Sequence, residues 1–110
     1  MPIVHVVLLR FKPDVAPSVV EATCQQFLSL QERCVRPATQ TPYLRSLVGG
    51  RENSPEGLAN GFTHVFVSEF ESEDDRRFYL EEDPAHRALA TSLGGVVEQV
   101  QAVDFVPGVF

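Results

Sequence analysis

The side chains best suited to acid–base chemistry in this sequence are its three histidines, His5, His64 and His86. An imidazole gives or takes a proton near neutral pH, and in its neutral form it also binds metal ions. His86 stands in the stretch FYLEEDPAH, three residues after Asp83 and seven after Tyr79. Asp-Pro-Ala-His predicts a helix start with Asp83 as N-cap, because the proline's missing N–H costs nothing at the first helical position. His86 is therefore predicted in the first turn of a helix.

Two effects on the protonation of His86 oppose each other. Backbone N–H groups of a first helical turn disfavour the protonated ring, whereas the acidic side chains of Glu81, Glu82 and Asp83 favour it. A single histidine on a helix is more often a surface residue than a catalyst, so its chemistry depends on what the rest of the chain brings to it.

The other two histidines interrupt apolar strand faces. His5 alternates with Ile3, Val7 and Leu9, whereas His64 alternates with three phenylalanines at positions 62, 66 and 70. An imidazole among such neighbours is more often a hydrogen-bonded core residue than a catalyst. The more specific alternative is a metal site formed by all three histidines, but the sequence has no pair of ligands at i and i+4 that would support it.

These residues lie on elements that the pattern of apolar residues predicts. The predicted elements are a strand at 3–9, a helix at 18–35, strands at 43–50 and 62–70, a helix from 72 to about 80, a helix from 84 to the Gly94-Gly95 pair, and a strand at 96–106. The order β-α-β-β-α-β, with the second helical segment in two pieces, predicts an α+β ferredoxin-like protomer. A four-stranded antiparallel sheet then carries helices on one face, in a single domain of residues 1–110.

The first strand, IVHVVLL, is apolar on both faces. Two helical segments cover only one face of a four-stranded sheet, so the other face needs a cover that one chain does not supply. A second copy of the chain, related by a two-fold axis, would cover this face of the sheet, and the sequence therefore predicts a homodimer.

Composition excludes several classes of partner. The formal charge of −6, without a run of Lys and Arg, argues against nucleic acid and against an anionic membrane surface. No apolar stretch approaches the roughly 20 residues that cross a bilayer, and the N-terminus lacks a basic segment and an A-x-A cleavage site. A cytosolic location is the default expectation.

The two cysteines, Cys24 and Cys34, would lie about 15 Å apart on one helix, so no disulfide between them is expected.

Four stretches together resemble one family, the stress-responsive dimeric α/β-barrel (Dabb) domain: HVVLLRFK, SPEGLANGFTHVFVSEFES, YLEEDPAH and VDFVPG. The resemblance implies two ferredoxin-like protomers that close an α/β barrel. The family includes the plant olivetolic acid cyclase, which closes a linear polyketide by aldol condensation without a cofactor in a pocket between sheet and helices.

By motif, the resemblance implies roles for individual residues. His86 corresponds to the catalytic histidine and Tyr79 to its tyrosine partner, with one additional residue between them here. His5, His64 and Asp104 correspond to pocket residues, and Val7 shares the strand face of His5. Phe27 replaces a pocket tyrosine, which implies a more apolar substrate.

Two functions follow as alternatives. In the first, the protein is a cofactor-independent cyclase or lyase on a small apolar carbonyl compound, with His86 as general base and Tyr79 as acid or oxyanion donor. In the second, it is a non-catalytic dimeric module that binds a small molecule or takes part in a stress response. The fold hosts both, so the cavity has to discriminate between them.

Overall fold

A computed structural model describes residues 1–110, and its four strands form one antiparallel sheet. The strands are β1 (Ile3–Phe11), β2 (Leu44–Arg51), β3 (His64–Phe70) and β4 (Val97–Phe105), and the helices are α1 (Pro17–Leu28), α2 (Leu30–Arg33), α3 (Glu73–Glu81) and α4 (Pro84–Leu93). The sheet order is β2-β3-β1-β4, which is the predicted ferredoxin-like arrangement.

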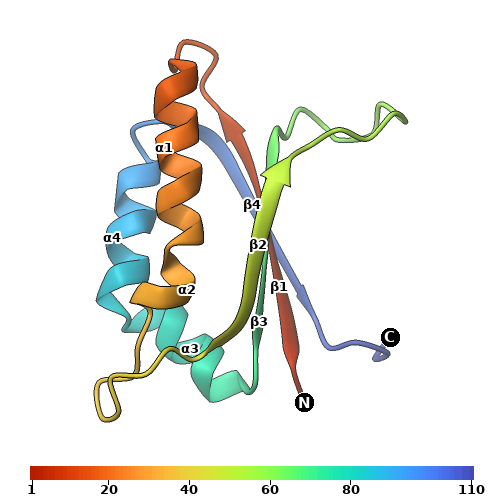
Figure 1. Ribbon diagram of the computed structural model, residues 1–110. Coiled ribbons are helices and arrows are strands. Elements are labelled where there is room, and N and C mark those ends of the chain that lie inside the picture. The colour runs from red at the N-terminus through yellow and green to blue at the C-terminus, as the bar shows by residue number, and fades with distance from the viewer.

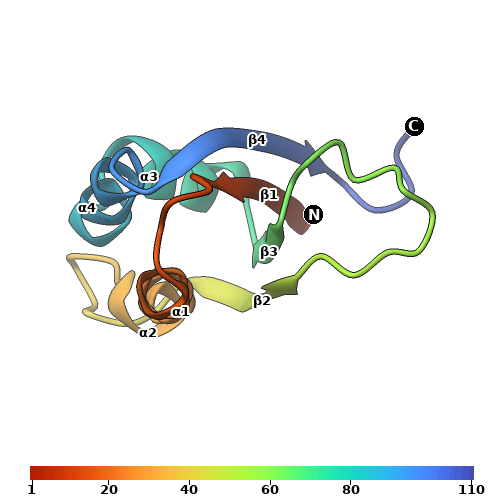
Figure 2. The ribbon, with the colours of Figure 1, turned by 90° about the horizontal axis from the view of Figure 1, so that it is seen from above.

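All the helices lie on one side of the sheet (Figure 1). Seen from above, α1 lies beside β2, whereas α3 and α4 lie toward β4 (Figure 2). The core between these layers is built from the odd-numbered residues of β1 and the inward face of β3, as the period-two alternation predicts. Within it the rings of Phe27 and Phe66 stack with centroids 4.0 Å apart. Gly49 permits this packing, because a Cβ there would lie 2.3 Å from the Phe66 ring.

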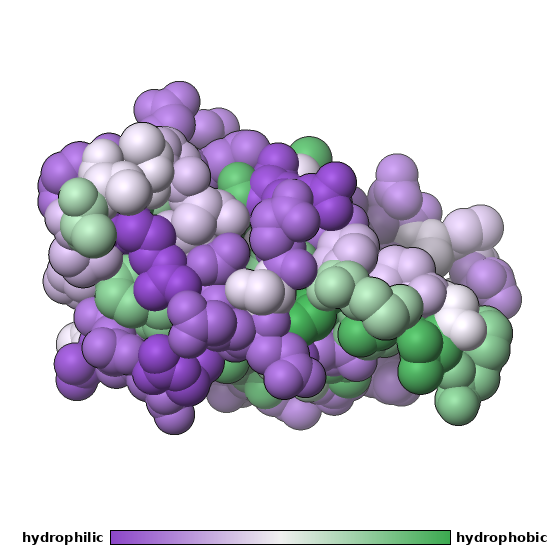
Figure 3. Space-filling view, turned by 90° about the horizontal axis from the view of Figure 1, so that it is seen from below, coloured by the Kyte–Doolittle hydropathy of each residue, from purple (hydrophilic) through white to green (hydrophobic).

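The opposite face of the sheet is bare and largely apolar. Even-numbered residues of β1 project from it, and their partners on the neighbouring strands are Val65, Val67, Val103 and Phe105 together with the polar residues Glu69, Gln99 and Gln101. Val103 and Phe105 are about half exposed. The β2–β3 loop and the C-terminal segment extend away on this side (Figure 2), and hydrophobic residues gather toward the same end of the molecule (Figure 3). One chain therefore leaves this face uncovered.

Two of the differences between the predicted and observed element boundaries have a clear local cause. The helix predicted at 18–35 is divided at Ser29, whose hydroxyl donates to the carbonyl of Gln26, so that a short α2 follows α1. The strand predicted from residue 62 begins at His64, because the Phe62 N–H donates to the Ala59 carbonyl in a turn. Both changes arise from local hydrogen bonds that hydrophobic periodicity does not register.

Candidate functional site

A cavity of about 330 Å³ lies between the sheet and the helices α1, α3 and α4. Its size is at the lower end of the range for small-molecule pockets. Apolar side chains form most of its wall, and the sequence-predicted residues His5, Val7, Phe27, Tyr79 and His86 all line it. The fold thus brings two of the three histidines into one apolar space.

His5 is held by an ion-pair network behind the cavity wall. Residues 5 and 104 face each other in the β1–β4 pairing, and His5 Nδ1 lies 2.6 Å from Asp104 Oδ1. The other carboxylate oxygen, Oδ2, accepts from Arg76 Nη1 at 3.1 Å. An ionised Asp104 accepts hydrogen bonds only, so Nδ1 of His5 carries the proton toward it.

His86 is placed by the start of α4, as the sequence predicts. Asp83 is the N-cap, and its Oδ1 accepts from the N–H of Ala85 at 2.9 Å. The ring is half-buried at the cavity, and its Nδ1 atom is buried without a hydrogen-bond partner. Burial lowers the pKa of His86, and the nearby His5 ring lowers it further. His86 is consequently neutral at pH 7 and able to accept a proton.

Asp83 is also a buried structural anchor. It is 1% exposed, and its Oδ2 accepts from the Tyr43 hydroxyl at 2.6 Å. One carboxylate thus joins the start of α4 to the segment just before β2. The sequence indicates the N-cap, but it carries no signal for the Tyr43 contact, which spans 40 residues.

Tyr79 contacts His86 by stacking. The two ring centroids lie 3.9 Å apart with an interplanar angle of 32°. The Tyr79 hydroxyl makes no hydrogen bond to the His86 ring, whereas the Tyr79 backbone interacts with the ring and opposes the lowering of its pKa. Tyr79 is 1% exposed, and burial together with the Cys34 thiol and the Asp83 carboxylate raises the pKa of its hydroxyl. The Tyr79 ring therefore supports His86, and its hydroxyl remains protonated.

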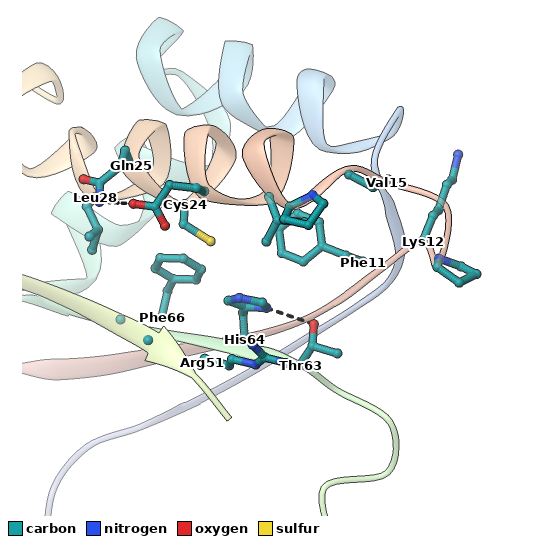
Figure 4. A pocket seen from close by; sticks show the side chains of 16 residues that line it. Phe11, Lys12, Val15, Cys24, Gln25, Leu28, Arg51, Thr63, His64 and Phe66 are labelled. Carbon is teal, nitrogen blue, oxygen red and sulfur yellow. Dashed lines mark hydrogen bonds between the residues drawn. The ribbon is translucent and has the colours of Figure 1, made fainter. Parts of the chain in front are cut away.

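His64 projects from the predicted, helix-facing side of the sheet but lies outside this cavity. It packs edge-on against Phe11, with ring centroids 5.0 Å apart. The stacked pair of Phe27 and Phe66 stands between the two regions, with Phe27 lining the first cavity and Phe66 a second one around His64 (Figure 4). The prediction of one cavity with all three histidines is wrong in this respect, because the aromatic stack divides the space.

Two contributors to the site were not among the residues predicted from the sequence. Arg76, at the start of α3, binds Asp104. Leu89 and its neighbours on α4 supply much of the apolar wall. A basic residue in the first turn of an acidic helix start is the only local signal for the Arg76 contact.

No group of three or more His, Cys, Asp or Glu side chains is placed to hold a metal ion. None of the helices has the length and apolarity needed to span a membrane.

A ferredoxin-like sheet with one bare apolar face, and with a histidine-containing cavity under its helices, defines the class of the dimeric α/β-barrel proteins. The chain belongs to the Dabb family: the model of the stress responsive A/B barrel domain matches residues 3–107. This confirms the family and the fold that the motifs indicated.

Three proteins illustrate the similarity. The stress-response A/B barrel domain-containing protein HS1 of Arabidopsis thaliana is 31% identical over 106 residues, covering 96% of this chain and 90% of that protein. A dimeric ferredoxin-like protein of unknown function from Thermobifida fusca has a TM-score of 0.72 at 29% identity, with 96% and 91% coverage. The hydroxynitrile lyase of Passiflora edulis has the same fold, with a TM-score of 0.82 at 20% identity and 99% and 96% coverage.

Proposed function

We propose that this protein is a cofactor-independent cyclase or lyase that acts, as a homodimer, on a small apolar carbonyl compound. The observation that carries the proposal is the pair of imidazoles, His5 and His86, at one apolar cavity. His86 has a lowered pKa and a buried nitrogen without a partner. Perturbed titratable groups in a concave apolar site favour a functional role over a structural one.

In the proposed reaction His86 is the general base. Its neutral ring removes a proton from the carbon next to a carbonyl, and the electron pair of the broken C–H bond forms an enolate. The apolar wall excludes water, which strengthens each polar interaction with the developing charge. Phe27 and Val7 hold the hydrocarbon part of the substrate.

His5 is the proposed partner for the substrate oxygen. When its ring is protonated, Asp104 balances the charge and Nε2–H donates a hydrogen bond to the carbonyl oxygen. In a cyclisation, the enolate carbon attacks a second carbonyl carbon, the electron pair of that C=O π bond moves to its oxygen, and the resulting alkoxide takes up the proton that His86 removed, which returns His86 to its neutral form. Arg76 holds Asp104 in place, and Tyr79 positions His86 through the stacked rings.

The test is exchange of deuterium into an alkyl methyl ketone, followed by NMR in D₂O. The wild-type protein should catalyse exchange at the carbons next to the carbonyl, and His86→Gln should abolish most of this catalysis. His64→Gln is the matched control, because its ring lies outside the cavity. Binding of the ketone at the His5 and His86 resonances without any exchange above buffer would support the non-catalytic binding module instead.

A further inference from the structure

A second cavity of about 570 Å³ lies on the far side of the Phe27–Phe66 stack. It is bounded by α1, by the loop that joins β1 to α1, and by the adjoining ends of β2 and β3 (Figure 4). None of its lining residues lines the cavity of His5 and His86. It is therefore a separate space, and what it binds does not depend on the function proposed above.

Arg51 supplies this cavity with a positive charge that no side chain of the protein neutralises. Other arginines of the sheet are paired, for example Arg45 with Glu71 at 3.1 Å and Arg10 with Glu98 at 3.0 Å, whereas Arg51 has no such partner. Of the other charged lining residues, Lys12 donates to the Gly95 carbonyl, and Glu21 accepts from Gln25. An unpaired guanidinium at the mouth of a pocket suits a carboxylate.

His64 lies opposite Arg51 in the β2–β3 pairing, and its hydrogen bonds define its tautomer. The Thr63 hydroxyl donates to the Leu9 carbonyl at 3.2 Å, so its oxygen accepts from His64 Nδ1–H at 2.9 Å. Burial and then Arg51 lower the pKa of His64, which keeps the ring neutral. Its Nε2 atom is consequently an acceptor that requires a donor from the ligand.

The remaining wall is suited to an aromatic ring. Phe66 and Phe11 flank the space, and the Cys24 sulfur points into it above His64 (Figure 4). Burial and Glu21 raise the pKa of the Cys24 thiol, so it is a small, protonated and weakly polar group and not a nucleophile.

We propose that this cavity binds a small aromatic hydroxy acid. The carboxylate pairs with Arg51, a hydroxyl donates to Nε2 of His64, and the ring packs against Phe66. A plain anion satisfies only the guanidinium, and a neutral phenol satisfies only the imidazole, so the two polar groups together define the ligand class.

The experiment uses 3-hydroxybenzoate as probe, with benzoate and 3-hydroxybenzamide as analogues that each lack one polar feature. Calorimetry gives the affinities, and amide NMR locates the site. We expect 3-hydroxybenzoate to bind most tightly and to shift the resonances of Cys24, Arg51 and His64. Each analogue should bind about tenfold more weakly, the usual cost of one well-placed polar contact.

Two variants assign the contacts. Arg51→Gln should remove the preference for 3-hydroxybenzoate over the amide, whereas Arg45→Gln, at a paired arginine on the same strand, should leave the affinity unchanged. His64→Phe should remove only the preference over benzoate. The proposal is overturned by absence of binding at millimolar probe, by shifts confined to His5 and His86, or by equal affinity for all three probes.

Discussion

The Nδ1 atom of His5 lies 2.6 Å from Oδ1 of Asp104, although 99 residues separate them in the chain. The contact joins β1 to β4, and a third group, Arg76 of α3, closes the network. A carboxylate behind an imidazole fixes the orientation and tautomer of the ring, which is the arrangement that an acid–base residue needs.

Asp104→Asn tests this relationship. The amide keeps the shape of the side chain but removes the charge that balances a protonated His5, so we expect deuterium exchange to slow at least about tenfold. Asp74→Asn, at an exposed carboxylate that also binds arginines, is the matched control and should retain full activity. Equal rates for Asp104→Asn and wild type would remove His5 from the mechanism.

Variants of Tyr79 distinguish two possible roles of this residue: support of the His86 ring by stacking, and acid catalysis by the hydroxyl. Tyr79→Phe keeps the stacked ring and removes the hydroxyl, so we expect it to retain most of the activity. Tyr79→Leu removes the stack and should lose about tenfold or more, because misplacement of a general base is costly. If Tyr79→Phe loses as much as Tyr79→Leu, the hydroxyl itself takes part in the chemistry.

Asp83 should be among the most sensitive positions for stability. Asp83→Ala removes the N-cap of α4 and leaves the Tyr43 hydroxyl without its acceptor. The cap contributes about 1 kcal/mol and an unsatisfied hydroxyl costs about 2 kcal/mol, so the free energy of unfolding should fall by about 3 kcal/mol. Urea denaturation measures this change. Tyr43→Phe leaves the cap in place but takes a donor from the buried carboxylate, so it should cost about 2 kcal/mol. Equal losses in both variants would contradict the role of the cap.

The bare sheet face predicts the assembly. Light scattering should give about twice the chain mass of 12.2 kDa, as expected from the dimeric relatives. Val6→Asp places a charge on this face and should split or unfold the dimer, because an unpaired buried charge is strongly disfavoured. Val19→Asp introduces the same charge on an exposed position of α1 and should leave the dimer intact. A folded wild-type monomer at micromolar concentration would contradict the prediction.

The lowered pKa of His86 predicts a dependence of stability on pH. As the pH falls below the ordinary histidine pKa of about 6.5, the unfolded chain gains a proton at residue 86 while the folded chain stays neutral. The free energy of unfolding should therefore decrease toward acid pH. His86→Gln should flatten this decrease between about pH 7 and pH 5 in a series of urea titrations. The lowered pKa of His64 makes the free energy of unfolding depend on pH in the same direction. If His86→Gln leaves the pH dependence unchanged, the acid sensitivity comes from His64 or another group.

The fold followed closely from local patterns. Alternation within IVHVVLL and FTHVFVSEF predicted which residues share a strand face with His5 and with His64, and Asp-Pro-Ala-His predicted His86 at the start of α4. The breaks at Ser29 and before His64 were missed, because they depend on individual side-chain and turn hydrogen bonds and not on hydrophobic period.

The order of the elements, the alternation within each strand and the histidines available for chemistry follow from residues a few positions apart in the chain. Which of these side chains meet depends on the packing of the folded core. The stacking of Phe27 on Phe66 separates His64 from His86, and the pairing of β1 with β4 brings Asp104 to His5. The Tyr79 ring lies on His86, and the Tyr79 hydroxyl makes no hydrogen bond to the imidazole. Such contacts join residues far apart in the chain, and they are selected by packing of the whole core, which local periodicity does not encode.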